Sequence, residues 1–549
     1  MSGFLAAAGG FSPALITFLV YTLAVFSLAI IANRLRKGSN FLSEYFLGSR
    51  GLGVWAFALT LAATSSSGGS FMGFPSKIYT HGWSLGLWIG SYMVVPICVM
   101  GLLGKRMNEV ARTAEAITIP DVLRDRFRSV AFGLTSVSLI VFFMTFNLIA
   151  QFKGGSTILK TLLGPIDAFT SSAASLPDWV SSLCSQGNEY LLCLVVFGVA
   201  VIVYTTYGGF HAVVWTDVMQ GLVMLAGVLI LLALTLSQVG GLENATRQLE
   251  KQTPPEFGTA IFFAEAGGGE LSLPKGTWLA SENGEIVRLK EAGSVSTEEM
   301  PVEVLIVTSG EEAGRIAGEV RRDVKARILE REPYKYGAGQ EGVYLTAPGP
   351  HRTKPEGFLP VLLALSFFAF WNFSGAGQPS YMVRQMAYRD TVVLRRSILF
   401  VGVFFTLIYL PLVLIFTSAR ILLPGMEISP DRIMPEMARA VTEQAGVPWL
   451  AGILVAAPFA AIMSSVDSFL LLVSSGVVRD VYQQKKKGEV SEKTIARLSR
   501  LTTVVVGALA VIFALNPPKF LQTLIVFASG GLGATFLVPV IMGLYWKRM

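Results

Sequence analysis

Long apolar stretches recur along the chain, and most of them approach the length that a lipid bilayer requires. A membrane-crossing helix needs roughly 20 consecutive apolar residues. Stretches of this kind lie at about 11–32, 52–74, 83–103, 130–151, 189–206, 212–236, 357–379, 396–418, 447–475, 498–514 and 518–545. The pattern predicts an all-α membrane protein of about eleven helices.

One long polar segment, residues 237–356, interrupts this series. Within it, residues 301–308 alternate between apolar and polar side chains, as a strand does, whereas residues 311–332 have helical spacing. The apolar stripe of the expected helix comprises Ile316, Val320, Val324 and Ile328. The segment therefore predicts a small α+β insert.

This insert divides the chain into three parts. Residues 1–236 carry the first six apolar stretches, and residues 357–549 carry the last five. Glycines 267–269 and the proline-rich stretch 346–355 resemble linkers. We favour the interpretation that the insert is a passive cap with no ligand of its own, and a ligand-binding unit is the alternative.

Composition supports a lipid environment and predicts an orientation. Charged residues make up only 15% of the chain, whereas an average soluble domain has about 25%. The first, third, seventh and ninth connecting loops are basic, and cytoplasmic loops are enriched in Lys and Arg. The insert has 14 Lys and Arg against 19 Asp and Glu. We expect a multi-pass protein of the cell (inner) membrane, with the N-terminus and insert outside and the C-terminus cytoplasmic.

Several other classes of function are disfavoured. The net charge of +7 arises from loops on one predicted side, so a nucleic-acid partner is not expected. Cys98, Cys184 and Cys193 have no metal-binding spacing. No phosphate-binding G-x-x-x-x-G-K-[ST] motif is present, which argues against ATP-driven pumping. Residues 14–31 are too long an apolar run for a cleavable signal peptide.

Two of the predicted helices are interrupted by small and helix-breaking residues. The second contains residues 62–70 (AATSSSGGS), and the seventh contains residues 373–379 (FSGAGQP). Unwound backbone survives in a membrane only where it lines a cavity. With the first helix set aside, these helices open two five-helix halves of opposite orientation, and paired interruptions of this kind mark a transporter's central site. The alternative is that the small residues only allow close helix packing.

The ninth helix has a polar face that suits a monovalent cation. Ala461, Ser464, Ser465 and Ser468 fall on one helical stripe. Neutral serine and carbonyl oxygens hold such an ion loosely enough to release it, as a coupling ion requires. The alternative is that these serines bond to their own helix.

Charged residues inside the apolar stretches point to the same region. A carboxylate at the bilayer centre costs about 2.5–3.5 kcal/mol, so it marks a functional site by default. Asp467 lies well inside the ninth stretch, where pairing with a basic residue is the alternative. Asp217 lies near the inner end of the sixth stretch, where snorkelling to water is the alternative. Snorkelling is favoured for Lys153, which would otherwise meet an anionic substrate.

Four separated motifs resemble the sodium:solute symporter family. They are residues 204–212 (YTTYGGFHA), residues 215–224 (WTDVMQGLVM), the pairs within 378–387 (Gln378-Pro379, Val383-Arg384, Met386-Ala387), and residues 461–465 (AIMSS). The last three are similar to the pantothenate and proline members. The resemblance implies a LeuT-type 5+5 inverted-repeat bundle with one extra N-terminal helix, and relatives usually continue for further helices beyond the position of Met549.

The resemblance also implies sodium sites. The first would use backbone oxygens of Ala63, Ser66 and Ala461 and the hydroxyls of Ser464 and Ser465. A candidate second cation site would comprise Asp217, Ser464, Asp467 and Ser468. Asp467 replaces a serine of the family, which leaves the sodium stoichiometry, and the use of a proton instead, open.

The implied substrate site lies beside the interruptions, at Ser65, Ser67, Gly68, Trp371 and Gly375. Trp371 matches an aromatic residue of proline-type members, whereas Gln151-Phe152 look more like pantothenate-type members. Ser65 departs from the acid of proline carriers. A pantothenate-like carboxylate or an amino acid is favoured as the solute.

The leading hypothesis is a sodium-coupled symporter that imports a small organic solute by alternating access, with Na+ as coupling ion and no organic cofactor. One alternative is a membrane substrate sensor that uses the insert, although no long cytoplasmic output domain follows the last apolar stretch. A membrane-embedded enzyme is the other, but the chain lacks an intramembrane histidine or an acid pair at catalytic spacing. Oligomeric state is left open.

Overall fold

The fold is that of a computed structural model. The structure describes residues 12–34, 50–264, 271–295, 301–308, 310–332, 340–352, 354–355, 357–485, 490–518 and 520–546. Among these, nine helices are long and apolar enough to cross a membrane, or ten if the bent pair Val361–Ala376 and Pro379–Gln385 counts as one span. The predicted linker glycines 267–269 and the basic residues Arg36, Lys37, Lys486, Lys487 and Arg548 lie outside the described residues.

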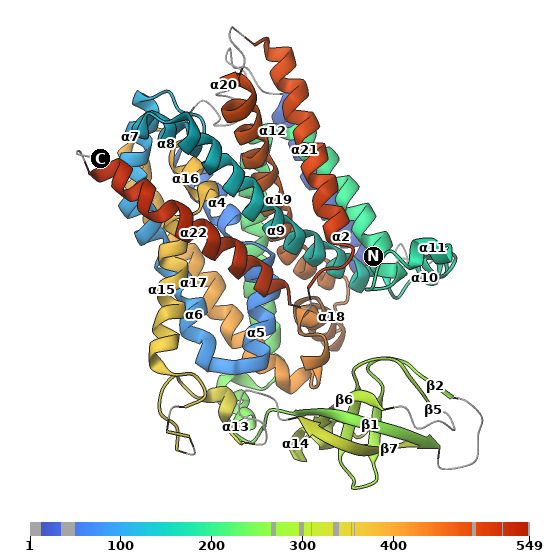
Figure 1. The fold of residues 1–549 in the computed structure, drawn as a ribbon. Helices are drawn as coiled ribbons and strands as arrows, with labels where there is room; N and C mark the ends of the chain where they lie inside the picture. The colour runs from blue at the N-terminus through green and yellow to red at the C-terminus, as the bar shows by residue number, and fades with distance from the viewer. Residues whose placement is uncertain are drawn as a thin grey trace.

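The long helices form a single bundle, and the insert lies beyond one end of it (Figure 1). The principal helices are α2 (Pro13–Arg34), α9 (Val130–Leu163), α12 (Asn188–Gln238), α17 (Thr391–Leu422), α19 (Leu450–Ser475), α21 (Glu492–Phe513) and α22 (Leu521–Tyr545). Shorter or bent segments complete it: α4 (Val54–Ser65), α5 (Phe74–His81), η5 (Ile97–Gly104), α15 (Val361–Ala376) and α16 (Pro379–Gln385). The predicted all-α membrane bundle is confirmed.

Burial separates the central helix from the peripheral ones. The span that contains α19 is 94% buried, whereas the span at Pro13–Ala32 in α2 is only 22% buried. α19 packs against α12, α9, α2 and α4. The helix with the serine stripe is therefore the core of the bundle, and α2 lies on the periphery, as an extra N-terminal helix would.

The Gly-Gly-Phe motif forms the predicted turn between two spans. Gly209 has φ 64° and ψ −178° inside α12, which splits it into Asn188–Phe210 and Ala212–Gln238. Residues with a Cβ rarely adopt this backbone conformation, so glycine is needed here.

The insert is mainly a small β-barrel. Strands β1 (Glu256–Ala264), β3 (Trp278–Ser281), β4 (Ile286–Leu289), β6 (Val302–Val307) and β7 (Arg321–Glu332) close in the order β1-β6-β4-β3-β7. β2 (Leu271–Leu273) and β5 (Gly293–Val295) form a separate antiparallel pair. The strand predicted at 301–308 is confirmed as β6.

The long helix predicted at 311–332 is wrong. Only α14 (Gly310–Ile316) is helical, and residues 321–332 form β7 between β1 and β3. Val324 and Ala326 are fully buried while the residue between them is only partly so, which is the two-residue period of a strand. Pairing on both edges of β7 overrides its local helical spacing.

A buried arginine joins the barrel to the bundle. Arg420, near the end of α17, has no exposed surface. Its guanidinium pairs with Glu427, lies 3.7 Å from Glu312 of α14, and donates to the Tyr79 carbonyl of α5 at 3.2 Å. Tyr344, in the part of the insert that follows the barrel, lies against the same guanidinium at 4.0 Å. Arg420 thus contacts both the insert and the adjoining end of the bundle.

Candidate functional site

The first predicted interruption is a real break in the helix. α4 ends at Ser65, and Ser66 is extended with φ −89° and ψ 110°. The chain resumes as a π-helical turn, Gly69–Gly73 (η2), followed by α5. The backbone amide of Gly68, freed by the break, donates to Oε1 of Gln151 on α9 at 2.8 Å. The unwound backbone is therefore held by a neighbouring helix, as a membrane interior requires.

The second predicted interruption is also present. α15 ends at Ala376, Gln378 is extended, and α16 begins at Pro379 with a bend of 53°. The Gln378 side-chain amide donates to the Ser529 carbonyl of α22 at 3.0 Å. α15 approaches α22 so closely that a Cβ at Gly377 would lie 2.6 Å from Gly533.

The two breaks face each other. The hydroxyl of Tyr381, in the first turn of α16, donates to the Ser65 carbonyl at the end of α4 at 3.4 Å. Each interrupted helix therefore contacts the other at its unwound point. This is the arrangement from which an inverted-repeat transporter builds a central site.

The residues expected at the first sodium site gather where α4 meets α19. The Ser465 hydroxyl lies 3.5 Å from the Ser66 carbonyl across these segments. Ala461 and Ser464 are buried on the same stretch of α19, and the Ala63 carbonyl accepts from the Ser66 amide. The Ser464 hydroxyl donates instead to Oδ1 of Asp217 at 2.5 Å, so it connects this group to the second candidate site.

Asp217 is fully buried and does not snorkel to water. Besides Ser464, its carboxylate accepts from the Thr60 hydroxyl of α4 at 2.5 Å and lies 3.5 Å from the Arg384 guanidinium of α16. A buried carboxylate is stable when it is paired and hydrogen-bonded. These three partners meet that condition and tie α12 to both interrupted helices.

Arg384 occupies the middle of the candidate second cation site. Its Nη2 donates to the Ser468 hydroxyl at 2.7 Å as well as facing Asp217, and its guanidinium lies 4.8 Å from the centre of the Phe210 ring. A positive charge built into the chain thus sits between Asp217 and Ser468.

Asp467 has a different environment from Asp217, although both are fully buried. One oxygen of Asp467 accepts from the Thr205 hydroxyl, whereas Oδ2 has no partner among the described residues. Within the part of the chain that the structure describes, Asp467 forms no ion pair with a basic residue. Two carboxylates and one guanidinium therefore share this part of the bundle.

The residues expected at the substrate site fall into two groups. Ser65, Ser67 and Gly68 lie at the first break, where the Ser67 hydroxyl accepts from the Gly69 amide at 3.1 Å. Trp371 lies one turn before the second break. Gly375 faces η5, since a Cβ there would lie 3.2 Å from Val99, so it does not join the group at the first break.

Trp371 belongs to an aromatic cluster around the part of the first broken helix that follows the break. Its ring stacks on Trp88 with centroids 6.4 Å apart and contacts Tyr92 at 5.2 Å and Phe74 at 5.9 Å. Tyr409 joins this cluster and hydrogen-bonds to Ser70 at 2.8 Å. The indole nitrogen of Trp371 is buried and has no hydrogen-bond partner among the described residues.

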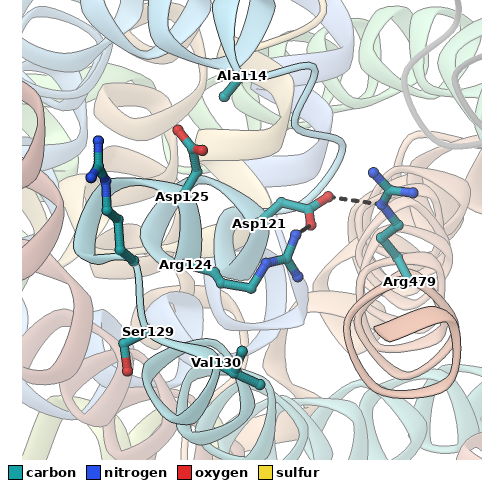
Figure 2. A pocket seen from close by; sticks show the side chains of 8 residues that line it. Ala114, Asp121, Arg124, Asp125, Ser129, Val130 and Arg479 are labelled. Carbon is teal, nitrogen blue, oxygen red and sulfur yellow. Dashed lines mark hydrogen bonds and ion pairs between the residues drawn. The ribbon is translucent and has the colours of Figure 1, made fainter. Parts of the chain in front are cut away.

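A charged network ties segments together at the opposite end of the bundle from the barrel. Figure 2 shows Asp121 of α8 (Ile119–Phe127) between Arg124 of the same helix and Arg479 of η9 (Gly476–Tyr482), beside a cavity of about 280 Å³. The Arg479 Nε donates to Asp121 at 3.1 Å, and Arg124 lies 3.5 Å from Asp480. Burial alone would raise the pKa of Asp121, but Arg479 and Arg124 hold it below the ordinary value.

Sequence comparison decides the family. The Sodium:solute symporter family profile matches residues 45–170, 184–271 and 341–549. The chain belongs to the sodium:solute symporter family. It is 28% identical to the sodium/pantothenate symporter of Escherichia coli (strain K12) over 97% of this chain and 86% of that protein. It is 25% identical to the sodium/proline symporter of Haemophilus influenzae over 98% of this chain and 85% of that protein.

The chain shares its fold, of the predicted LeuT type, with a solved sodium-coupled symporter. A substrate-bound, outward-open structure of a Na+-coupled sialic acid symporter aligns with a TM-score of 0.62. The alignment covers 98% of this chain and 87% of that one at 18% identity, so it shows a shared fold. The protein is a multi-pass membrane transporter that couples sodium to the movement of a small solute, and not an enzyme.

Gln151, Thr60, Thr205 and Tyr381 supply the contacts that hold the breaks and the buried acids. The sequence did not single out Thr60 or Tyr381. Gln151, Thr205 and Arg384 were recognised only as parts of motifs. The sequence does show a glutamine and an arginine among apolar residues, which is a signal for a buried polar role. It does not show which side chains these two residues contact, because that depends on helix packing.

Proposed function

We propose that this sodium:solute symporter imports a small organic solute that carries a carboxylate, either pantothenate-like or an amino acid, with one Na+ bound between α4 and α19. The ion's ligands would be the backbone oxygens of Ala63, Ser66 and Ala461 and the hydroxyls of Ser464 and Ser465. The observation that carries this proposal is the approach of the Ser465 hydroxyl to the Ser66 carbonyl across the helix break, at 3.5 Å.

At the second candidate site we propose that Arg384 acts as a resident cation. Its contacts to Asp217 and Ser468 support this role. Asp467 is the remaining acid of the group, and it has one oxygen without a protein partner. Arg384 balances only one of the two carboxylates, but its guanidinium already occupies the position between Asp217 and Ser468. A second Na+ would therefore compete with Arg384 for these oxygens, and one coupling sodium is the favoured count.

The solute would lie beside the breaks, against Ser65, Ser67, Gly68 and Trp371, with Gly375 allowing α15 to approach η5. Relatives named for pantothenate and proline support a carboxylate-bearing solute. Basic loops on one side support an orientation with the insert and N-terminus outside and the C-terminus cytoplasmic.

Transport in reconstituted vesicles tests the proposal. An inward sodium gradient should drive labelled pantothenate or proline above its equilibrium level, because one charge moved through 100 mV supplies about 2.3 kcal/mol. A panel that adds a short monocarboxylate and a neutral sugar identifies the solute class. Sodium-dependent binding without accumulation of any of these would instead support a membrane sensor and refute symport.

A further inference from the structure

A second cavity lies where the insert meets the membrane bundle, apart from the two helix breaks. It has a volume of about 500 Å³, and small-molecule sites typically have about 300–1,000 Å³. Its wall combines the end of α9, the segment Pro430–Arg432 (η8), residues 517–518 and the barrel residues Lys275, Lys290 and Glu291. Neither the bundle nor the barrel forms it alone.

A buried ion pair forms one part of this wall. Lys153 donates to Oδ2 of Asp431 at 2.7 Å and to the Pro518 carbonyl at 3.1 Å. The Leu521 amide also donates to Oδ2 of Asp431. Asp431 is 9% exposed, and its Oδ1 is buried with no partner among the described residues. A buried carboxylate oxygen without a donor is costly, so it favours a ligand that brings an O–H or N–H group.

The rest of the wall is predominantly basic. Besides Lys153, it carries Lys160, Lys275, Lys290 and Arg432, against only Asp431 and Glu291. Lys160, Lys290 and Arg432 pair with Glu189, Glu303 and Glu436, none of which is part of the wall. In each of these pairs the basic side chain lines the cavity and the acidic side chain does not. The wall therefore favours a ligand with a negatively charged group.

The barrel is fixed where it completes the cavity. Arg288 of β4 donates to the Gly425 carbonyl at 2.9 Å and packs over the Trp278 ring at 4.8 Å. Gly425 has φ 75°, and a Cβ there would lie 2.4 Å from Trp278. Only glycine permits this approach. The contact preorganises Lys275 and Lys290 against the bundle, which lowers the cost of binding.

We propose that this cavity is a capture site for a small organic anion that also carries a hydroxyl or ammonium group. The carboxylate of the ligand would lie among the lysines, and its hydroxyl or ammonium would donate to Oδ1 of Asp431. The insert is then a contributor to solute binding and not a passive cap. The link to uptake rests on the proposed function, because the captured class is the class proposed for transport.

Protection of an engineered cysteine tests the site without a need for transport. Gln186 is exposed and lines the cavity, so Gln186→Cys is placed in the full chain with Cys98, Cys184 and Cys193 changed to serine. Its labelling by a neutral maleimide is timed in detergent micelles without a sodium gradient. Pantothenate, proline, acetate and glucose are the probes.

The proposal expects pantothenate or proline to slow labelling by about threefold or more at saturation, because a bound ligand covers the wall. Acetate lacks the second donor and glucose lacks the charge, so both should protect less. Labelling that neither pantothenate nor proline slows, or that glucose slows equally, would overturn the capture site. Sodium-driven uptake in the same protein would still stand in that case.

Variants of the barrel lysines distinguish binding in this cavity from a nonspecific effect of the probes on the labelling rate. Lys275→Gln and Lys290→Gln remove wall charges far from the bundle core, and each should raise the ligand concentration needed for half-protection by about threefold or more. Lys354→Gln changes an exposed lysine outside the wall and serves as the control. Asp431→Asn should abolish the advantage of pantothenate and proline over acetate. Half-protection unchanged in both barrel variants would refute the role of the insert.

Discussion

Individual side chains at the centre of the bundle fall into two groups, according to whether their polar atoms are already hydrogen-bonded. Some, such as Gln151, satisfy backbone groups that the helix breaks expose. Others, such as Ser465, leave an oxygen close to a carbonyl of the opposing segment without a strong bond of their own. The first group stabilises the broken helices, and the second supplies the oxygens that we propose as ligands of the ion.

Ser465→Ala should raise the sodium concentration for half-maximal uptake by about fivefold, because one neutral oxygen ligand contributes about 1 kcal/mol. Initial uptake rates across a sodium series in vesicles provide the measurement. Ser156→Ala is the matched control, since Ser156 is equally buried but bonds to its own helix in α9. The same sodium dependence in both variants would remove Ser465 from the ion site.

Asp217→Asn should strongly destabilise the protein, because it leaves the buried Arg384 without its carboxylate. Removing one partner of such a pair costs about 3–5 kcal/mol. Adding Arg384→Gln should recover much of the lost thermal stability in detergent, although uptake should remain impaired. If the double variant is no more stable than Asp217→Asn alone, the two residues do not act as a pair.

For single residues, the sequence predicted which side chains belong to the site better than it predicted their hydrogen-bond and ion-pair partners. The serines of α19 and the two intramembrane acids were found from spacing and from the cost of burying charge. Their contacts to Thr60, Thr205 and Arg384 come from helices far apart in the chain. No periodicity encodes such pairings, because they depend on how the helices pack.

Among the elements, the interrupted helices followed from local chemistry, whereas β7 did not. Clusters of glycine, serine and proline disfavour a continuous helix wherever they occur, so the breaks at 66–68 and 377–378 were predictable. The segment 311–332 has helical spacing as well as a strand-like alternation at its end. Only its pairing with β1 and β3 decides between them.

The strand assignment can be tested by substitution. Ala326→Asp should unfold the barrel, because Ala326 is fully buried on β7 and an unpaired buried charge is strongly unfavourable. Limited proteolysis of the full-length protein, with cleavage sites mapped to the insert, reports the change. Leu329→Asp is the control, since Leu329 is 48% exposed on the same strand. Equal resistance of both variants to the protease would contradict the barrel.

Across the whole molecule, alternating access requires that one end of the bundle opens while the other closes. The network of Asp121, Arg124, Arg479 and Asp480 joins α8 to η9 at the end away from the barrel. Because the pKa of Asp121 lies below its ordinary value, its contribution is present at neutral pH and is lost only as the pH falls below about 4. The network should favour closure of that end.

Arg479→Gln should therefore increase access from that end. With native cysteines removed, labelling of a Ser475→Cys reporter should become about threefold faster or more, because a partly buried ion pair is lost. Arg497→Gln is the control, because Arg497 is exposed at the start of α21. Unchanged reporter labelling in Arg479→Gln would show that the network does not restrain opening.

The buried guanidinium of Arg420 offers a way to control this protein through its insert. It contacts the insert at Glu312 of α14, and it contacts the second part of the first broken helix at Tyr79 of α5. A nanobody that binds only the barrel would therefore also restrain a helix that must rearrange during the transport cycle. Such a nanobody should slow transport without contacting either helix break.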